Sequence, residues 1–203
     1  MARLLLIRHA PTPETGTRLT GRLPGVHLGE EGRLRAKATA DGLRSARLAA
    51  IYASPIERTW ETAEIIAEPH GLTPLSDDGL LEVDYGKWSG RTLASLSRLK
   101  SWRTVQLTPS RMVFPDGEGI AAAQRRAVEA CERLASAHGK ATIALVSHAD
   151  IIKTVVSHYL GQPLDLFQRI SVAPASVSVV DIPRQGVPMV AAVNAVGAAG
   201  TWR

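Results

Sequence analysis

The sequence has little cysteine, few aromatic residues and no long apolar run. Cys131 is the single cysteine among 203 residues, which excludes an intramolecular disulfide and is typical of a reducing compartment. No apolar run approaches the roughly 20 residues that a membrane span needs, and the apolar block at residues 4–7 is too short for the core of a signal peptide. We therefore expect a cytoplasmic protein that does not associate with membranes.

The chain also lacks the clustered basic residues of a nucleic-acid-binding protein. Its formal net charge is +5, but Lys and Arg are scattered, and the aromatic residues that stack on bases make up only 4%. We expect no nucleic-acid partner, and the positive charge suits a small anionic substrate equally well. No metal site is expected, because there is no H-E-x-x-H motif and the spacing of His148 and His158 matches no common ligand pattern.

Apolar segments that alternate with helix-forming segments predict the fold. Buried strands are expected at residues 3–8, 48–54, 142–147, 176–182 and 188–196. Helices are expected at residues 31–47, 55–69, 92–102 and 119–139, and from 149 to a stop at Gly161, with Ser54 and Pro55 as the N-cap and first residue of the second helix. This order predicts a single domain over residues 1–203, a three-layer α/β/α sandwich around a mostly parallel sheet.

Two of the predicted strands end abruptly at histidines. Arg8 and His9 follow the apolar run LLLI, and His148 follows TIALVS. In an open α/β sheet, ligands bind beyond the carboxyl ends of the strands, so this architecture can bring the three side chains to one edge. A buried strand is a rigid platform, and its end is where a catalytic side chain is held in a fixed geometry while still exposed.

Four sequence blocks resemble those of one enzyme family. They are LLLIRHA with Arg8 and His9, SPIERTWETA with Arg58, LLEVDYGKWSG with Glu82, and ALVSHAD with His148. In this order they resemble the signature of the histidine phosphatase superfamily, the phosphoglycerate-mutase-like enzymes. The usual form of the first block ends in Arg-His-Gly, whereas Ala10 follows the histidine here, which requires a negative φ at that residue.

The resemblance implies a role for each of these five side chains. His9 is the expected nucleophile, and it requires its second ring nitrogen to be held by a hydrogen bond, which the loop after the strand is placed to accept. Arg8, Arg58 and His148 are expected to clamp the phosphoryl group in transit. Glu82 is expected to be protonated when the ester is bound, to give its proton to the leaving alcohol and then to take one from water.

Further residues are candidates for substrate binding. Thr20, Gly21 and Tyr85 resemble substrate-contacting positions of the mutase branch, and Thr15 stands where family members commonly have an asparagine that contacts phosphate. For each of these, the reading as an ordinary loop residue stays open. The same holds for three arginines: Arg18, Arg22 and Arg111. We interpret Trp88 as a packing anchor below the glutamate.

The expected function is hydrolysis of small-molecule phosphomonoesters through a phosphohistidine on His9. The alternative is mutase-type phosphoryl transfer, which would need a bisphosphoglycerate primer, whereas a phosphatase needs no cofactor. The mutases are longer, with insertions that cap the site, so the compact chain favours the phosphatase. An alternative from another class is a degenerate phosphate-ester-binding or interaction module, suggested by Ala10 and Thr15. The sequence is compatible with a monomer or a homodimer.

Other phosphate and hydrolase chemistries lack their motifs. There is no G-x-x-x-x-G-K-[ST] phosphate loop and no G-x-S-x-G serine elbow. A cysteine phosphatase needs an arginine six residues after its cysteine, but Ala137 occupies that position after Cys131. The histidine-based reading is therefore the one that the residues favour.

Overall fold

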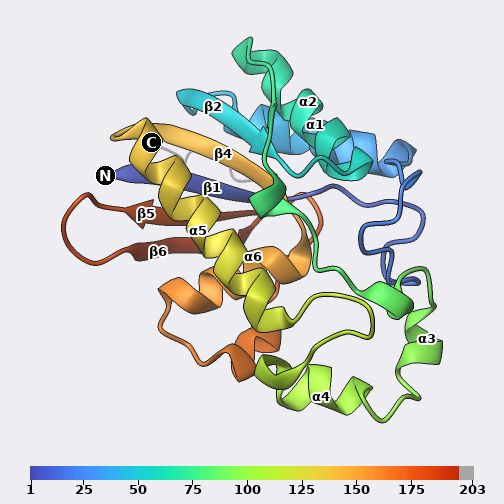
Figure 1. Ribbon diagram of the computed structural model, residues 1–203. Helices are drawn as coiled ribbons and strands as arrows, with labels where there is room; N and C mark the ends of the chain where they lie inside the picture. The colour runs from blue at the N-terminus through green and yellow to red at the C-terminus, as the bar shows by residue number, and fades with distance from the viewer. Residues whose placement is uncertain (197–203) are drawn as a thin grey trace.

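A six-stranded sheet forms the centre of the computed structural model, which describes residues 1–196 (Figure 1). The strands are β1 (Ala2–Arg8), β2 (Leu48–Ala53), β3 (Leu75–Ser76), β4 (Thr142–Ser147), β5 (Val177–Ile182) and β6 (Met189–Ala195). Their order is β3-β2-β4-β1-β5-β6, in which the first four are parallel and β5 and β6 are antiparallel to their neighbours. The prediction of a mostly parallel sheet is confirmed: the sheet is mixed, with its parallel strands on one side and two antiparallel strands on the other. Residues 197–203 of the predicted domain lie outside the described part.

Helices cover both faces of the sheet. They are α1 (Glu30–Leu43), α2 (Glu57–Ala67), α3 (Leu93–Leu96), α4 (Trp102–Leu107), α5 (Ile120–His138) and α6 (Ala149–Tyr159). The short 3-10 helices are η1 (Glu68–His70), η2 (Asp78–Leu80), η3 (Gly86–Trp88), η4 (Pro109–Arg111) and η5 (Leu164–Arg169).

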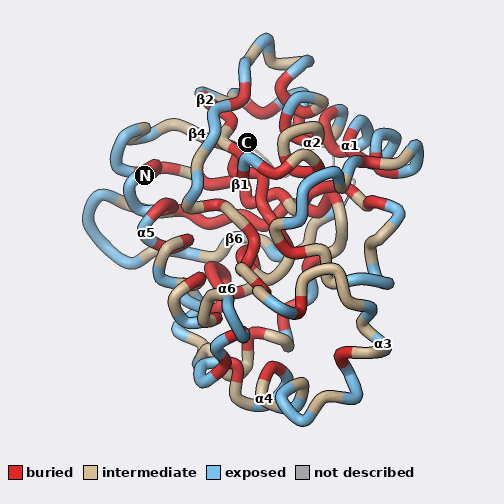
Figure 2. The backbone as a smooth tube through the Cα atoms, turned by 45° about the vertical axis from the view of Figure 1, so that its right-hand side comes forward, coloured by how far each residue is buried: buried red, intermediate tan, exposed pale blue. Residues whose placement is uncertain are grey.

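Strand β1 is apolar on both faces because it serves two cores. Leu4 and Leu6 pack in a cluster with side chains of α5 and α6, and Leu5 and Ile7 pack in a second cluster with side chains of α1 and α2. This is why its sequence shows no alternation of apolar and polar residues. The central strands are buried along their length (Figure 2). The predicted three-layer sandwich is thereby confirmed.

A cap segment, residues 86–114, lies beside the sheet and carries η3, α3, α4 and η4 (Figure 1). The single helix predicted at residues 92–102 is wrong, because the structure has α3 and α4 with a turn between them. Ser95 and Ser97 donate side-chain hydrogen bonds to carbonyls three residues earlier, and such bonds compete with helix propagation.

Aromatic rings join this cap segment to the body of the molecule. Trp88 stacks on Trp102 with ring centroids 6.1 Å apart, and its ring meets the edge of Phe114 at 5.2 Å. Phe114 also contacts Tyr85 edge-on at 4.9 Å. Trp88 is only 3% exposed, which confirms its interpretation as a packing anchor.

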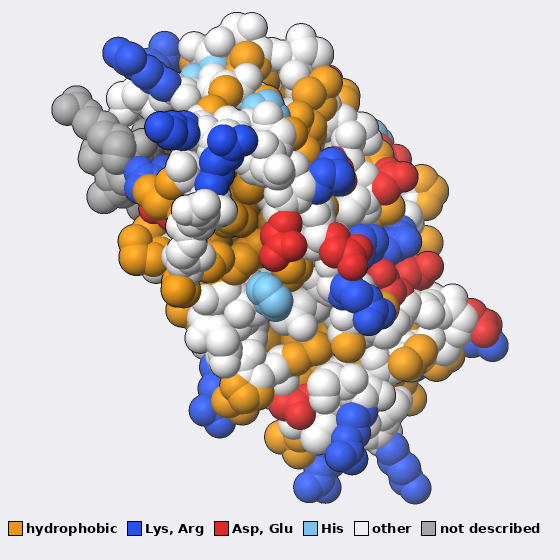
Figure 3. Space-filling model, turned by 60° about the vertical axis from the view of Figure 1, so that its left-hand side comes forward, with side chains coloured by type: hydrophobic (Ala, Val, Ile, Leu, Met, Phe, Trp, Pro, Cys, Tyr) orange, Lys and Arg blue, Asp and Glu red, His pale blue; other side chains and the backbone are white. Residues whose placement is uncertain are grey.

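The helices are unlike membrane spans, and the charged side chains on the surface are of mixed sign. Within residues 1–196, every helix is too short or too polar to cross a bilayer. On the face drawn in Figure 3, basic side chains lie in separate groups with acidic side chains between some of them. This distribution is typical of a solvated protein surface.

Candidate active site

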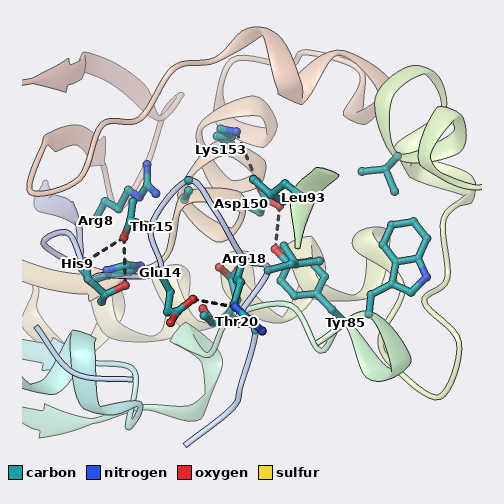
Figure 4. A pocket seen from close by; sticks show the side chains of 18 of the residues that line it. Arg8, His9, Glu14, Thr15, Arg18, Thr20, Tyr85, Leu93, Asp150 and Lys153 are labelled. Atoms are coloured by element: carbon teal, nitrogen blue, oxygen red, sulfur yellow. Dashed lines mark hydrogen bonds and ion pairs between the residues drawn. The ribbon is translucent and has the colours of Figure 1, made fainter. Parts of the chain in front are cut away.

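The five central residues of the predicted site come together at the carboxyl edge of the sheet. His9 directly follows β1, His148 lies between β4 and α6, and Arg58 belongs to the first turn of α2. Arg8 ends β1, and Glu82 lies in the loop after η2. A cavity of about 330 Å³ is lined by four of them, Arg8, His9, Arg58 and Glu82, and extends towards the cap segment (Figure 4). His148 is fully buried behind this lining. The parallel arrangement of β1 and β4 therefore brings the strand ends together as expected.

His9 is a buried neutral imidazole. Its Nδ1 lies 2.8 Å from the carbonyl oxygen of Ala10, and because a carbonyl only accepts, Nδ1 carries the proton. The unprotonated Nε2 accepts a long hydrogen bond from Arg58 Nε at 3.4 Å. Burial first, and then the charge of Arg58, lowers the pKa of His9 to about 3. The predicted hydrogen bond to the following loop is confirmed. The Nε2 lone pair has the chemistry of a nucleophile, and an attack on phosphorus would replace its long hydrogen bond from Arg58.

The change from glycine to alanine after this histidine is accommodated. Ala10 is fully buried, and it is not among the described residues with positive φ. Its N–H donates to the Thr62 hydroxyl at 3.1 Å, while its carbonyl oxygen accepts the hydrogen bond from His9 Nδ1. The backbone geometry that orients the imidazole is thus compatible with a side chain at this position.

Two arginines, the buried Arg58 and the partly buried Arg8, each have a buried donor without a protein acceptor. Arg58 is 1% exposed, and its Nη2 donates to the Gly21 carbonyl at 2.7 Å and to His148 Nδ1 at 3.1 Å. Arg8 donates from Nη1 to the Val172 carbonyl at 2.6 Å. Among the described residues, Arg58 Nη1 and Arg8 Nε are buried without an acceptor. Since such orphaned donors are unfavourable and both residues line the cavity, they suit an anion that supplies the acceptors.

His148 is fixed by a serine that sequence reasoning assigned elsewhere. Because His148 Nδ1 accepts from Arg58, its Nε2 carries the proton and donates to Ser54 Oγ at 2.9 Å. Burial and the charge of Arg58 lower the pKa of His148 well below its usual value. The prediction of Ser54 as a helix N-cap is wrong: α2 begins at Glu57, and Ile56 is its N-cap. The buried histidine needs a partner, and Ser54 supplies it.

Glu82 is a buried carboxyl group close to the second histidine. It is 8% exposed, its Oε1 accepts from Val83 N at 3.0 Å, and its Oε2 lies 4.0 Å from His148 Nδ1. Burial first, and then the charge of Asp150, raises the pKa of Glu82 to about 7. A large fraction of this carboxyl is therefore protonated at neutral pH, as an acid for a leaving group requires.

An ion-pair network supports the loop that carries Glu82. Arg22 donates from Nε to the Glu82 carbonyl at 2.7 Å and from Nη2 to Glu118 at 2.9 Å. Glu118 also pairs with Arg126, which donates to three carbonyls of the loop: those of Asp78, Gly79 and Leu81. Arg22 and Glu118 therefore position the acid through the backbone.

All four of the remaining predicted contact residues line the cavity: Thr15, Thr20, Gly21 and Tyr85. Thr15 Oγ1 accepts from the N–H of Thr12 at 2.9 Å, which fixes the loop after the nucleophile. Gly21 has φ +56, and its carbonyl oxygen accepts a hydrogen bond from Arg58 Nη2. Tyr85 donates to Asp150 at 2.9 Å. Of the three further arginines, Arg18 also lines the cavity, Arg22 lies in the network above, and Arg111 ends η4.

Sequence reasoning missed several polar residues of the cavity: Thr12, Glu14, Gln106, Asp150, Lys153 and Gln168. Asp150 and Lys153 lie in the first two turns of α6, and Gln168 lies in η5. The sequence signal for Asp150 and Lys153 was the helix predicted after His148: when a helix begins directly after a site histidine, residues two to five positions further on face the same cavity. No group of three metal-binding side chains occurs within residues 1–196.

The fold and this edge define an α/β protein whose buried histidines and arginines surround a cavity with donors for an anion. The chain belongs to the histidine phosphatase superfamily: the sequence model of the Histidine phosphatase superfamily (branch 1) matches residues 4–195. The resemblance of the four blocks is thereby confirmed at the level of the family.

Individual relatives carry phosphatase and mutase names. Phosphoserine phosphatase 1 of Hydrogenobacter thermophilus is 31% identical over 185 residues, which cover 89% of this chain and 86% of the relative. The probable phosphoglycerate mutase GpmB of Erwinia tasmaniensis is 30% identical over 183 residues, with 89% and 85% covered. The solved structure of Bacillus stearothermophilus YhfR superposes with a TM-score of 0.90 at 28% identity and covers 97% and 98% of the two chains. The chain spans 54% of the length of the mycobacterial relatives that it also matches.

Proposed function

We propose that the protein hydrolyses small-molecule phosphomonoesters through a phosphohistidine intermediate on His9. The observation that carries the proposal is the state of His9: its Nδ1–H donates to the Ala10 carbonyl, while Nε2 is unprotonated and accepts only a long hydrogen bond from Arg58 Nε. The names of the two curated relatives support phosphoryl transfer as the reaction class.

The phosphate group binds between the two arginines. Arg8 Nε and Arg58 Nη1 donate to its oxygens and compensate the charge that spreads over them in the transition state. His148 acts through Arg58: its Nδ1 accepts from Arg58 Nη2 and so orients the guanidinium that binds the phosphate. The clamp thus becomes complete only with phosphate bound.

Transfer to the enzyme and hydrolysis use Glu82 in both directions. His9 Nε2 attacks phosphorus, the P–O bond to the alcohol breaks, and the leaving oxygen takes the proton of Glu82. The Glu82 carboxylate then takes a proton from water, whose oxygen attacks phosphorus as the P–Nε2 bond breaks. Inorganic phosphate leaves, and His9 and Glu82 return to their starting states. This scheme needs no cofactor or metal.

Phosphate release by the wild type and by His9→Ala tests the proposal. Release from a panel of phosphomonoesters by the wild type, and its loss in His9→Ala, is the expected result. His158→Ala is the matched control, because His158 is an exposed histidine of α6. Full activity of His9→Ala would exclude His9 as the nucleophile.

The mutase and the degenerate binding module give different results in the same experiment. Isomerisation of 3-phosphoglycerate in the presence of the bisphosphate, without phosphate release, would make the protein a mutase. Binding of esters without turnover would make it a binding module. The retained acid Glu82 supports an enzyme, because binding alone needs no buried, protonated carboxyl next to the phosphate.

A further inference from the structure

The charged side chains that line the cavity beyond the phosphate end are paired with one another. Asp150 accepts from Tyr85 Oη at 2.9 Å and lies 3.4 Å from Lys153 Nζ. Arg18 Nε lies 3.2 Å from Glu14 Oε2. Apart from the two arginines of the phosphate end, each described cation that lines the cavity therefore has a carboxylate partner. A second anionic group on a substrate would meet no unpaired positive charge there.

The wall that the cap segment adds to the cavity is mostly apolar, with Gln106 as its polar side chain. Leu93 and Val105 of the cap segment line it together with the stacked rings of Trp88 and Trp102. Figure 4 shows Leu93 and Tyr85 across the cavity from Arg8 and His9. A charged group against this wall would lose its hydration without compensation, whereas an alkyl or aromatic group would be removed from water.

The size of the cavity allows a leaving group much larger than a methyl alcohol. The volume of about 330 Å³ equals roughly eleven water volumes of about 30 Å³ each. The four heavy atoms of a phosphoryl group and the ester oxygen together fill less than half of this space. The remainder has room for a ring of six heavy atoms.

We propose that the substrate is the phosphomonoester of an uncharged alcohol with an apolar body, such as an aromatic ring, and that the site discriminates against alcohols carrying a second anionic group. This inference rests on the proposed hydrolysis at His9. It sets the chain apart from enzymes that act on carboxylate-bearing esters such as phosphoserine or phosphoglycerate. The paired charges exclude the second anion, and the cap segment selects the apolar body.

Two esters that differ in one substituent test the proposal. 4-Methylbenzyl phosphate and 4-carboxybenzyl phosphate share the benzylic leaving oxygen and differ in the group that faces the apolar wall. We expect kcat/KM to be at least about tenfold higher for the methyl compound. Equal values, or a preference for the carboxylate, would overturn the inference while leaving the hydrolysis itself intact. Release of phosphate from no ester would instead refute the proposed function.

A substitution in the cap segment tests the wall. Val105→Asn places an amide on the inward side of α4, and Leu107→Asn makes the same kind of change on an exposed residue of that helix. Val105→Asn should reduce the preference for the methyl compound about fivefold or more, while Leu107→Asn keeps the wild-type ratio. An unchanged ratio in a folded Val105→Asn protein would show that the wall does not select the substrate.

A second variant tests the charge pairing without disturbing the apolar packing. Asp150→Asn removes the charge partner of Lys153 but keeps an oxygen that can accept from Tyr85. We expect kcat/KM for 4-carboxybenzyl phosphate to rise about fivefold or more relative to the methyl compound. Asp41→Asn, on the exposed face of α1, is the control. If Asp150→Asn and Asp41→Asn gave the same ratio of kcat/KM for the carboxylate and methyl esters, the argument from charge pairing would be contradicted.

Discussion

Glu82→Gln should stabilise the protein at alkaline pH while removing much of its activity. Burial raises the pKa of Glu82 from 4.5 to about 7. An acid whose pKa is raised in the folded state contributes stability below its unfolded pKa, and this contribution is lost as the pH rises through the folded value. The difference between 4.5 and about 7 corresponds to about 3 kcal/mol. Glutamine does not ionise, so the variant escapes this loss.

Urea unfolding measures the effect at two pH values: about 4.5, which is the pKa of an unperturbed glutamate, and about 8.5, which lies above the raised pKa of Glu82. The free energy of unfolding of Glu82→Gln should exceed that of the wild type by about 3 kcal/mol at the higher pH and match it at the lower pH. Glu129→Gln, at an exposed position of α5, is the control. A variant no more stable than the wild type at alkaline pH would refute the argument that burial keeps this carboxyl protonated.

The same variant tests the catalytic role of the acid. Turnover of 4-methylbenzyl phosphate should fall about 100-fold or more, because its leaving alkoxide needs a proton. The loss should be smaller for 4-nitrophenyl phosphate, whose leaving group is stable as an anion. In the wild type, kcat/KM for the alkyl ester should fall above pH about 7 as Glu82 ionises. Undiminished turnover of the alkyl ester would remove Glu82 from the mechanism.

Three further perturbations address the phosphate site and the fold. Inorganic phosphate at ten times its Kd should raise Tm by about 3 °C, and by less in Arg58→Lys, which loses the unpaired Nη1 donor; differential scanning fluorimetry measures both. Ser54→Ala leaves His148 Nε2 without its acceptor and should lower the free energy of unfolding by about 1–3 kcal/mol in urea titrations. An unchanged free energy of unfolding would contradict the assigned tautomer of His148. Gly86→Ala should cost more than about 2 kcal/mol, because Gly86 has φ +49 and a Cβ there would overlap a neighbouring carbonyl. Gly71→Ala, with φ +63 and open space, should cost less, and equal losses would contradict the steric argument.

Strands β1, β2, β4, β5 and β6 and the meeting of Arg8, His9 and His148 were accessible from the local sequence pattern. The short strand β3 was missed, and Arg58 and Glu82 were assigned through the family resemblance. The unbroken apolar run of β1 predicts burial on both faces, and the two cores confirm it. Strand ends then predict where His9 and His148 meet, since parallel neighbours expose their carboxyl ends at one edge. These predictions depend on periodicity and strand direction, which the chain encodes over short distances.

Features that depend on partners distant in the sequence were not accessible. Ser54 and Pro55 resemble a helix start, but the hydroxyl of Ser54 bonds with a histidine 94 positions away, and the helix begins later. Asp150 and Lys153 face the cavity only because α6 begins at its edge and the cap segment folds over it. One sequence contains no signal for the bond between Ser54 and His148. For Asp150 and Lys153 it contains only their position at the start of a helix that follows a site histidine, and the same residue types on an exposed helix would be ordinary surface residues.

Trapping the phosphoenzyme tests the central claim most directly. The protein is mixed with a radiolabelled, activated phosphomonoester and quenched in alkali within a single turnover, and the label is mapped by peptide. Our account predicts a base-stable, acid-labile phosphoryl group on His9 that decays at the rate of turnover and is absent from His9→Ala. Turnover without a labelled enzyme, or label on another residue, would contradict nucleophilic attack by His9.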